Sequence, residues 1–141
     1  MNTVLILEDE APIRTLVKLT LAPLGYTVLQ AATAEEALRH FMDADACLDL
    51  LIADVNLPGG RSGVRVASEL RSLLPCLRII LISGVPPSYW DEQDAAEWSE
   101  IPSDSVVTLQ KPFHAAELLQ SVNSLVRDSM LLRRALSERN W

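Results

Sequence analysis

Acidic, hydroxyl and basic side chains follow four of the apolar runs in this sequence, and side chains of these types can together carry out phosphoryl transfer. Glu8 and Asp9 follow the first run, and Asp54 follows the third. Ser83 follows the fourth run, and Lys111 follows the fifth. A carboxylate can attack phosphorus, while a hydroxyl and an ammonium group stabilise the oxygens of the transferring group. We therefore predict that these five side chains meet in one site.

Three carboxylates in one pocket need a compensating positive charge. At about 5 Å and an effective dielectric constant of about 20, two carboxylates repel each other by roughly 3 kcal/mol. Lys111 supplies one positive charge, and a hard divalent cation with oxygen ligands would supply the rest, which favours Mg²⁺. Asp54 is the best candidate for the nucleophile, because it alone closes a wholly apolar strand and enters a turn-rich loop at 57–60.

Each of these residues also has an ordinary structural explanation. An acid after a strand often caps the next helix, so Asp9 or Glu10 could cap a helix that begins near Pro12. Lys111 alone could be a solvated lysine, and Ser83 alone could be a turn residue. Compatible groups at four strand ends of one predicted sheet favour a shared site over coincidence. That site requires Asp54 to lie near Asp9 and to be reachable from solvent.

The elements that must position these residues follow from the apolar periodicity. Apolar runs without polar alternation are typical of strands in a parallel sheet that is covered on both faces. Five such runs separated by helical patterns predict an α/β fold, a flavodoxin-like (βα)5 three-layer sandwich with a parallel sheet of order 2-1-3-4-5. In this order the first and third strands are neighbours. The strands are expected at residues 4–7, 26–29, 48–53, 77–82 and 106–109.

The predicted helices carry start and stop signals. The first begins near Pro12 and stops before Gly25. The second begins at Thr33 and Glu36, which have the spacing of a capping box. The other helices are expected at 63–74, where Pro75 ends the helix, at 88–100, and from about 113 onwards.

The segment around the fourth helix is unusual in sequence and in charge. Two prolines delay the helix, and Ser88 and Asp91 have the spacing of a cap. Residues 84–105 contain six acidic residues and no basic one, in a chain whose net charge is −7. Because this segment would repel phosphate backbones, we expect no direct binding to nucleic acid.

Length and composition predict one folded domain in a reducing compartment. The chain has 141 residues, of which 49% are hydrophobic, enough for a core without disulfides. Cys47 and Cys76 lie beside apolar runs, where we expect small buried thiols. The first apolar run is too short for a signal peptide or a membrane span, so we expect a cytoplasmic protein without membrane contact.

The motifs quoted above resemble the receiver domain of two-component response regulators over about residues 3–128. The segments that carry the resemblance are VLILEDE at 4–10, LIAD at 51–54, LPGG at 57–60, ILISG at 80–84 and KPF at 111–113. The resemblance implies that Asp54 is phosphorylated by a histidine kinase or a phosphotransfer protein. It also implies a phosphoacceptor that assists its own phosphorylation and dephosphorylation, rather than an enzyme, and that signals through a protein partner.

The resemblance also implies a set of ligands and contacts. Asp9, Asp54 and the backbone carbonyl of Asn56 would bind Mg²⁺, with Glu8 assisting through water. Ser83 would be the switch hydroxyl. Lys111 would contact the phosphoryl group and form a cis peptide bond with Pro112, which an X-Pro sequence permits at small cost.

Three features depart from the family pattern. Thr108 stands where receivers usually carry an aromatic switch residue. The loop at 57–63 is slightly longer than usual, as in receivers of hybrid kinases and some stand-alone receivers. The 28 residues from Ser83 to Lys111 exceed the usual spacing, and the excess lies in the acidic segment. We therefore hypothesise that residues 85–98 shift on phosphorylation, with Tyr89, Trp90 or Trp98 reporting the change; the alternative is that these aromatic residues are static.

The C-terminal tail has an apolar pattern of its own. We predict a receiver domain at 1–128 and an extension of the last helix, or a linker, at 129–141. The tail is too short for an ordinary DNA-binding domain, and a longer parent protein is an open alternative. A helical seam suggests a homodimer or a contact with a partner helix, and an ordinary buried face is an equally open alternative. The seam consists of Leu118, Val122, Leu125, Ser129, Leu132 and Leu136.

Two other functions remain as alternatives. A pseudo-receiver scaffold would never accept phosphate, but such proteins usually lack one of the acids or the lysine. An aspartyl-phosphate phosphatase commonly carries its Asp-x-Asp motif on the first strand. Here the nearest analogue, Asp54-Val55-Asn56, follows the third strand.

Overall fold

Five parallel strands form a single sheet in the structure, a computed structural model that describes residues 3–43 and 47–125. The strand order is β2-β1-β3-β4-β5, and every neighbouring pair is parallel. The predicted order 2-1-3-4-5 is therefore confirmed. The strands are β1 (Thr3–Leu7), β2 (Thr27–Ala31), β3 (Leu50–Asp54), β4 (Arg78–Ser83) and β5 (Val106–Gln110).

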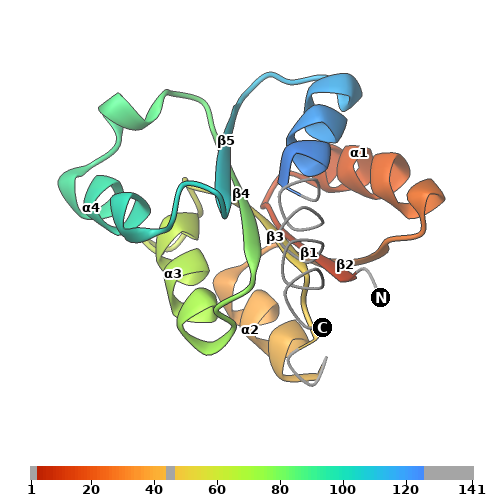
Figure 1. Cartoon of the computed structure of the whole chain (residues 1–141), viewed down its shortest axis with the longest axis horizontal. Coiled ribbons are helices and arrows are strands. Elements are labelled where there is room, and N and C mark those ends of the chain that lie inside the picture. Colours follow the sequence, from red (N-terminus) through yellow and green to blue (C-terminus); the bar gives the residue numbers. More distant parts are fainter. Residues whose placement is uncertain (1–2, 44–46, 126–141) are drawn as a thin grey trace, which may run out of the picture.

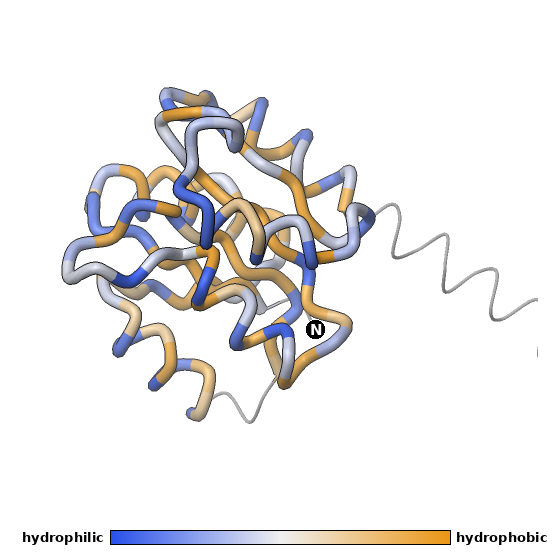
Figure 2. Tube along the Cα trace, turned by 90° about the vertical axis from the view of Figure 1, so that its left-hand side faces the viewer, coloured by the Kyte–Doolittle hydropathy of each residue, from blue (hydrophilic) through white to orange (hydrophobic). Residues whose placement is uncertain are grey.

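Helices cover both faces of this sheet (Figure 1). Helix α1 and a helical segment at 115–125 pack on one face, and α2, α3 and α4 pack on the other. Figure 2 shows the apolar strands running between the two helical layers. The helices are α1 (Ala11–Leu21), α2 (Ala34–Asp43), α3 (Gly63–Leu73) and α4 (Glu92–Glu100), with short 3-10 helices η1 (Ala22–Leu24) and η2 (Pro87–Tyr89).

The uninterrupted apolar runs reflect two separate cores. In β1, Leu5 and Leu7 pack into the core beside α2 and α3, whereas Val4 and Ile6 pack into the core beside α1. All four side chains are fully buried. Because successive strand residues point to opposite faces, a strand between two helical layers must be apolar at every position.

Local signals explain most helix boundaries. Gly25 ends the η1 turn with a φ of 95°, a backbone region that favours glycine. Thr33 Oγ1 accepts a hydrogen bond from Glu36 N, as a capping box requires. The Glu36 carboxylate accepts from Ala32 N, one residue before the expected partner. Glu10 is the N-cap residue of α1 but makes no side-chain cap bond, so the capping explanation for Glu10 is wrong.

The fourth helix begins later than predicted. The expected start at Ser88 is wrong, because residues 87–89 form a 3-10 turn and α4 begins at Glu92. Trp90 and Asp91 have extended backbones, which interrupt the helical path. The Asp91 carboxylate then accepts a 2.8 Å hydrogen bond from Asp94 N and caps α4.

The cysteine prediction is also wrong, because Cys47 and Cys76 are both exposed. Each is followed by a buried leucine, Leu48 or Leu77, that lies just before the next strand. Among the helices within the described ranges, none has the length and hydrophobicity to span a bilayer.

The start of the predicted helical seam is an ordinary buried face. Leu118, Val122 and Leu125 are at most 2% exposed and pack into the core beside α1. These three residues are therefore unavailable for a dimer contact. The rest of the seam, the boundary at residue 128 and the extension at 129–141 lie outside the described residues.

Candidate functional site

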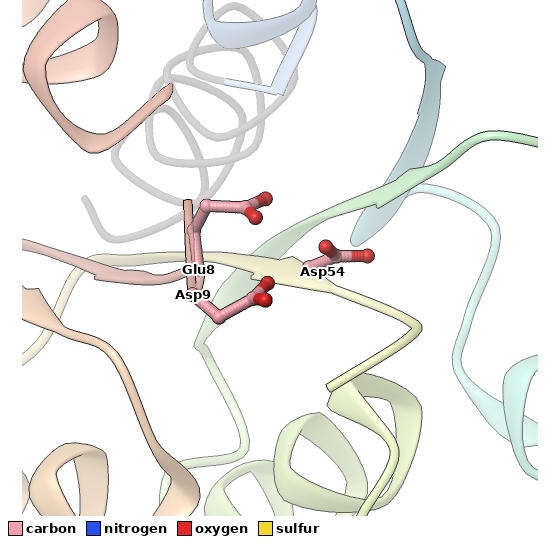
Figure 3. Close-up of side chains that lie close together, drawn as sticks. All are labelled: Glu8, Asp9 and Asp54. Carbon is pink, nitrogen blue, oxygen red and sulfur yellow. The ribbon is translucent and has the colours of Figure 1, made fainter. Parts of the chain in front are cut away.

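The sheet brings the acidic residues together at the carboxyl ends of β1 and β3. Leu7 is paired with Ala53, so Glu8 and Asp54 are the next residues on two adjacent strands. One ligand oxygen from each of Glu8, Asp9 and Asp54 lies within 4.8 Å of the others. Figure 3 shows these carboxyl groups gathered at the strand ends. The predicted meeting of the three acids is therefore observed.

Lys111 supplies the positive charge of this cluster. Its Nζ lies 2.9 Å from Asp54 Oδ2 and 3.3 Å from Glu8 Oε1. A longer contact of 3.9 Å reaches Glu10 Oε1, on the exposed side of the cluster. Burial alone would lower the pKa of Lys111, but the hydrogen bonds and charges of Asp54 and Glu8 outweigh it and raise the pKa. The lysine is therefore held in its charged form.

The backbone around Lys111 fixes where its side chain can reach. Lys111 N donates a 2.9 Å hydrogen bond to the carbonyl of Ser83, which ties the end of β5 to the end of β4. The peptide bond between Lys111 and Pro112 is cis, as the family resemblance implies. Lys111 thus follows the edge strand β5, and its ammonium group reaches the carboxyl groups at the ends of β1 and β3.

The surroundings of Glu8 disfavour the ionised form of its carboxyl group. It is fully buried, and burial followed by the charge of Asp54 raises its pKa to about 7. Its Oε2 lies 3.2 Å from Lys111 Nζ but has no hydrogen-bond partner among the described residues. The ammonium group of Lys111 therefore does not satisfy every carboxylate oxygen of the cluster. An all-oxygen donor set with an unsatisfied buried carboxylate oxygen fits a hard cation such as Mg²⁺.

Asp54 is less open to solvent than the sequence led us to expect. Only 4% of the residue is exposed. Its Oδ1 accepts from Asn56 N at 3.0 Å, and its Oδ2 accepts from Lys111. A carboxylate has about four lone-pair sites, so one hydrogen bond at each oxygen leaves others for an incoming group. Its neighbours in the cluster are more open to solvent, since Lys111 is half-buried and Asp9 is exposed.

The loop after Asp54 is held close to the strand end. Asn56 and Ser62 form an isolated antiparallel bridge, and Ser62 Oγ accepts from Val64 N to cap α3. A Cβ at Gly63 would overlap the backbone oxygen of Asp54. This position requires glycine because the first turn of α3 packs directly against the backbone of Asp54. Coordination by the Asn56 carbonyl stays a prediction.

Ser83 lies at the same edge, with its hydroxyl held by a residue that the sequence analysis did not assign to the site. It is 3% exposed and directly follows Ile82, which is paired with Asp54. Its Oγ accepts hydrogen bonds of 3.2 Å from Val85 N and from the indole Nε1 of Trp90. No sequence spacing predicts the Trp90 contact, because an irregular turn brings the ring back to β4.

The sequence matches one family over most of its length. Residues 4–123 match the family described as "Response regulator receiver domain". The phosphate regulon transcriptional regulatory protein PhoB of Pseudomonas aeruginosa is 32% identical over 128 residues, 89% of this chain and 52% of PhoB. The sensor kinase CckA of Brucella abortus is 31% identical over 125 residues, 88% of this chain and 12% of CckA. The chain thus spans about half of the first relative.

Solved structures give the same result. The response regulator TrrA of Thermotoga maritima, in complex with Mg²⁺ and BeF, has a TM-score of 0.69 and 33% identity, and the match covers 89% of this chain and 99% of TrrA. The chemotaxis protein CheY4 of Vibrio cholerae has a TM-score of 0.72 and 27% identity, with 89% and 98% covered. From its sequence, its sheet order and its acidic site, this chain belongs to the response regulator receiver domain family.

Proposed function

We propose that this protein is the phosphoacceptor of a two-component phosphorelay and that Asp54 receives the phosphoryl group. The observation that carries the proposal is the contact of one ammonium group, that of Lys111, with both Asp54 and Glu8 inside a cluster of three carboxylates. The cluster combines a nucleophilic carboxylate, a cation for phosphoryl oxygens and an acidic metal-binding set.

In the proposed reaction, a carboxylate oxygen of Asp54 attacks the phosphorus of a phosphohistidine on a histidine kinase or phosphotransfer protein. The P–N bond breaks, its electron pair stays on the imidazole nitrogen, and the new O–P bond gives an aspartyl phosphate. Lys111 stabilises one phosphoryl oxygen and the Ser83 hydroxyl donates to another. The same groups would assist later hydrolysis by water, so the protein is a phosphoacceptor rather than a classical enzyme.

The proposed metal ligands are Asp9, Asp54 and the carbonyl of Asn56, with Glu8 assisting through water. Mg²⁺ bound there would neutralise charge on the phosphoryl oxygens. The unsatisfied Oε2 of Glu8 supports this assignment, since a cation lowers the cost of keeping that buried carboxylate ionised.

A pocket of about 360 Å³ beside the acidic cluster is the surface on which we expect the phosphohistidine donor to dock. Its polar end contains Lys111, so a histidine side chain above that end would face the acceptor. Its remaining wall is mainly apolar and suits the apolar face of a donor helix. The pocket is lined by Glu10, Ile13, Leu16, Lys111, Pro112 and Phe113.

We expect the downstream partner to be a protein, because the acidic residues of the segment at 84–105 disfavour nucleic acid. Exchange of phosphoryl groups with a histidine kinase makes the cytoplasm the expected location.

Intact-mass measurement with Mg²⁺ and acetyl phosphate tests the acceptor. The wild type should gain one phosphoryl group, and Asp54→Asn should gain none. Asp49→Asn is the matched control, because Asp49 is an exposed aspartate near the other end of β3 and a carboxamide oxygen can still accept from Thr3 N.

Three results would contradict the proposal. A gain in Asp54→Asn would locate the acceptor elsewhere. No gain in the wild type, with acetyl phosphate or with a phosphorylated histidine donor, would favour the pseudo-receiver scaffold. Sustained turnover of a phosphomonoester would favour the phosphatase.

A further inference from the structure

Trp90 contacts the hydroxyl group that the proposed function assigns to the phosphoryl oxygens. The Trp90 indole N–H donates to Ser83 Oγ at 3.2 Å and also to the carbonyl of Val85 at 3.3 Å. The Val85 backbone N–H donates to the same Ser83 oxygen. Trp90 is half-buried and packs against the core beside α3.

These two donors determine what the Ser83 hydroxyl can do. A hydroxyl oxygen has two lone pairs and one proton. Val85 N and Trp90 Nε1 occupy both lone pairs of Ser83 Oγ, so its remaining hydrogen-bonding function is to donate its proton. A phosphoryl group offers three acceptor oxygens. The indole therefore orients the hydroxyl for the partner that an aspartyl phosphate would provide.

The same indole ring connects Ser83 to α4. Trp90 and Trp98 pack edge to face, with ring centroids 5.6 Å apart and an interplanar angle of 73°. Trp98 lies in α4 and packs into the core beside α3. A movement of Ser83 Oγ toward a phosphoryl oxygen would therefore carry the Trp90 ring and displace its contact with α4.

Thr108 does not offer a second route of this kind. It lies on the edge strand β5, opposite Leu81, and its side chain is exposed. A small exposed threonine has no aromatic ring that could follow the Ser83 hydroxyl toward a phosphoryl group. The aromatic group that contacts the hydroxyl instead comes from the turn between β4 and α4.

We propose that Trp90 is a positioning residue for phosphorylation: its indole N–H orients the Ser83 hydroxyl as a donor, and its packing on Trp98 transmits the displacement of Ser83 to α4. This inference rests on the proposed function, because it needs a phosphoryl group at Asp54. It assigns the role to Trp90 among the three aromatic residues of the segment. Tyr89 is 76% exposed and next to it, which makes it the natural control.

The test uses Mg²⁺ with beryllofluoride, a phosphoryl analogue, and follows the indole N–H resonances by NMR. Trp98→Phe and Trp141→Phe assign the Trp90 resonance by elimination. In the wild type this resonance should shift on saturation with beryllofluoride. In Ser83→Ala, saturated at a higher concentration, it should stay in place because its acceptor oxygen is missing.

The variant Trp90→Phe keeps an aromatic ring and removes only the donor. One lost hydrogen bond of ordinary strength should weaken beryllofluoride binding about five-fold. Amide exchange in α4 should change on beryllofluoride binding in the wild type and in Tyr89→Phe, but not in Trp90→Phe. A purely structural role would alter stability without altering this ligand-dependent response.

The outcomes separate this inference from the proposed function. If the wild type gains a phosphoryl group and the Trp90 resonance does not move, the inference is wrong and the proposed function stands. If Trp90→Phe binds beryllofluoride as the wild type does and α4 still responds, the inference is also wrong. If Trp90→Phe does not fold, the response of the Trp90 indole resonance to beryllofluoride in the wild type and in Ser83→Ala decides whether the inference holds. If no phosphoryl group is gained, both proposals fail.

Discussion

The two ends of the site are built in different ways. At β1 and β3, adjacent strands in register deliver Glu8 and Asp54 to the same edge, and α3 packs directly on the backbone of Asp54. At the end of β4, an exposed turn with a 3-10 helix precedes α4 and sends Trp90 back to Ser83. The acceptor end, named for the role proposed for Asp54, is therefore set by strand pairing. The switch end, named for the role proposed for Ser83, depends on one side-chain contact across an irregular loop.

The same substitution at two glycines should give the largest contrast between these ends. Gly63→Ala places a Cβ against the Asp54 backbone and should lower the free energy of unfolding by at least about 3 kcal/mol. Gly84→Ala meets no atom within 4 Å and should stay within about 0.5 kcal/mol of the wild type. Urea unfolding measures both. Equal changes in stability in the two variants would mean that α3 does not pack tightly against the backbone of Asp54.

The buried charge of Glu8 should make the acceptor end sensitive to pH. Its pKa is raised from an ordinary 4.5 to about 7, so the folded state binds this proton more tightly than the unfolded state does. The associated stability, at most roughly 3 kcal/mol, is fully present below pH 4.5 and is lost as the pH rises through about 7.

Unfolding at pH 5.5 and pH 7.5 checks this dependence. We expect the free energy of unfolding of Glu8→Gln to depend less on pH than that of the wild type. Added Mg²⁺ should stabilise the wild type more at pH 7.5, where Glu8 is ionised, than at pH 5.5. A magnesium effect that is equal at both pH values would argue against Glu8 as part of the metal site.

The smallest expected effect concerns the caps of α3 and α4. Asp91→Ala removes the side chain that accepts from Asp94 N and should cost about 1 kcal/mol. Because α4 follows an exposed turn, we expect the loss as faster amide exchange confined to α4. Ser62→Ala removes a similar cap from α3, and its effect should reach the global unfolding transition. A loss of global stability in Asp91→Ala, as expected for Ser62→Ala, would show that the two ends are equally well anchored.

The acceptor end could be predicted from the sequence almost residue by residue. Uninterrupted apolar runs predict buried parallel strands, and the first polar residues after them, Glu8 and Asp54, must then lie at one edge. The switch end could not be predicted in the same way. Helical periodicity suggests a start at Ser88, but extended backbones at Trp90 and Asp91 delay α4, and no local rule states where the indole ring will pack.

The division of the apolar interior into two cores has one more consequence. The pocket at Ile13, Leu16 and Phe113 lies over the layer of α1, while Trp98 and α4 belong to the opposite layer. A protein that delivers a phosphoryl group and a protein that senses α4 would thus approach from opposite sides of the sheet. If Asp54 is the acceptor and α4 is the output as proposed, the two proteins could bind together in one ternary complex.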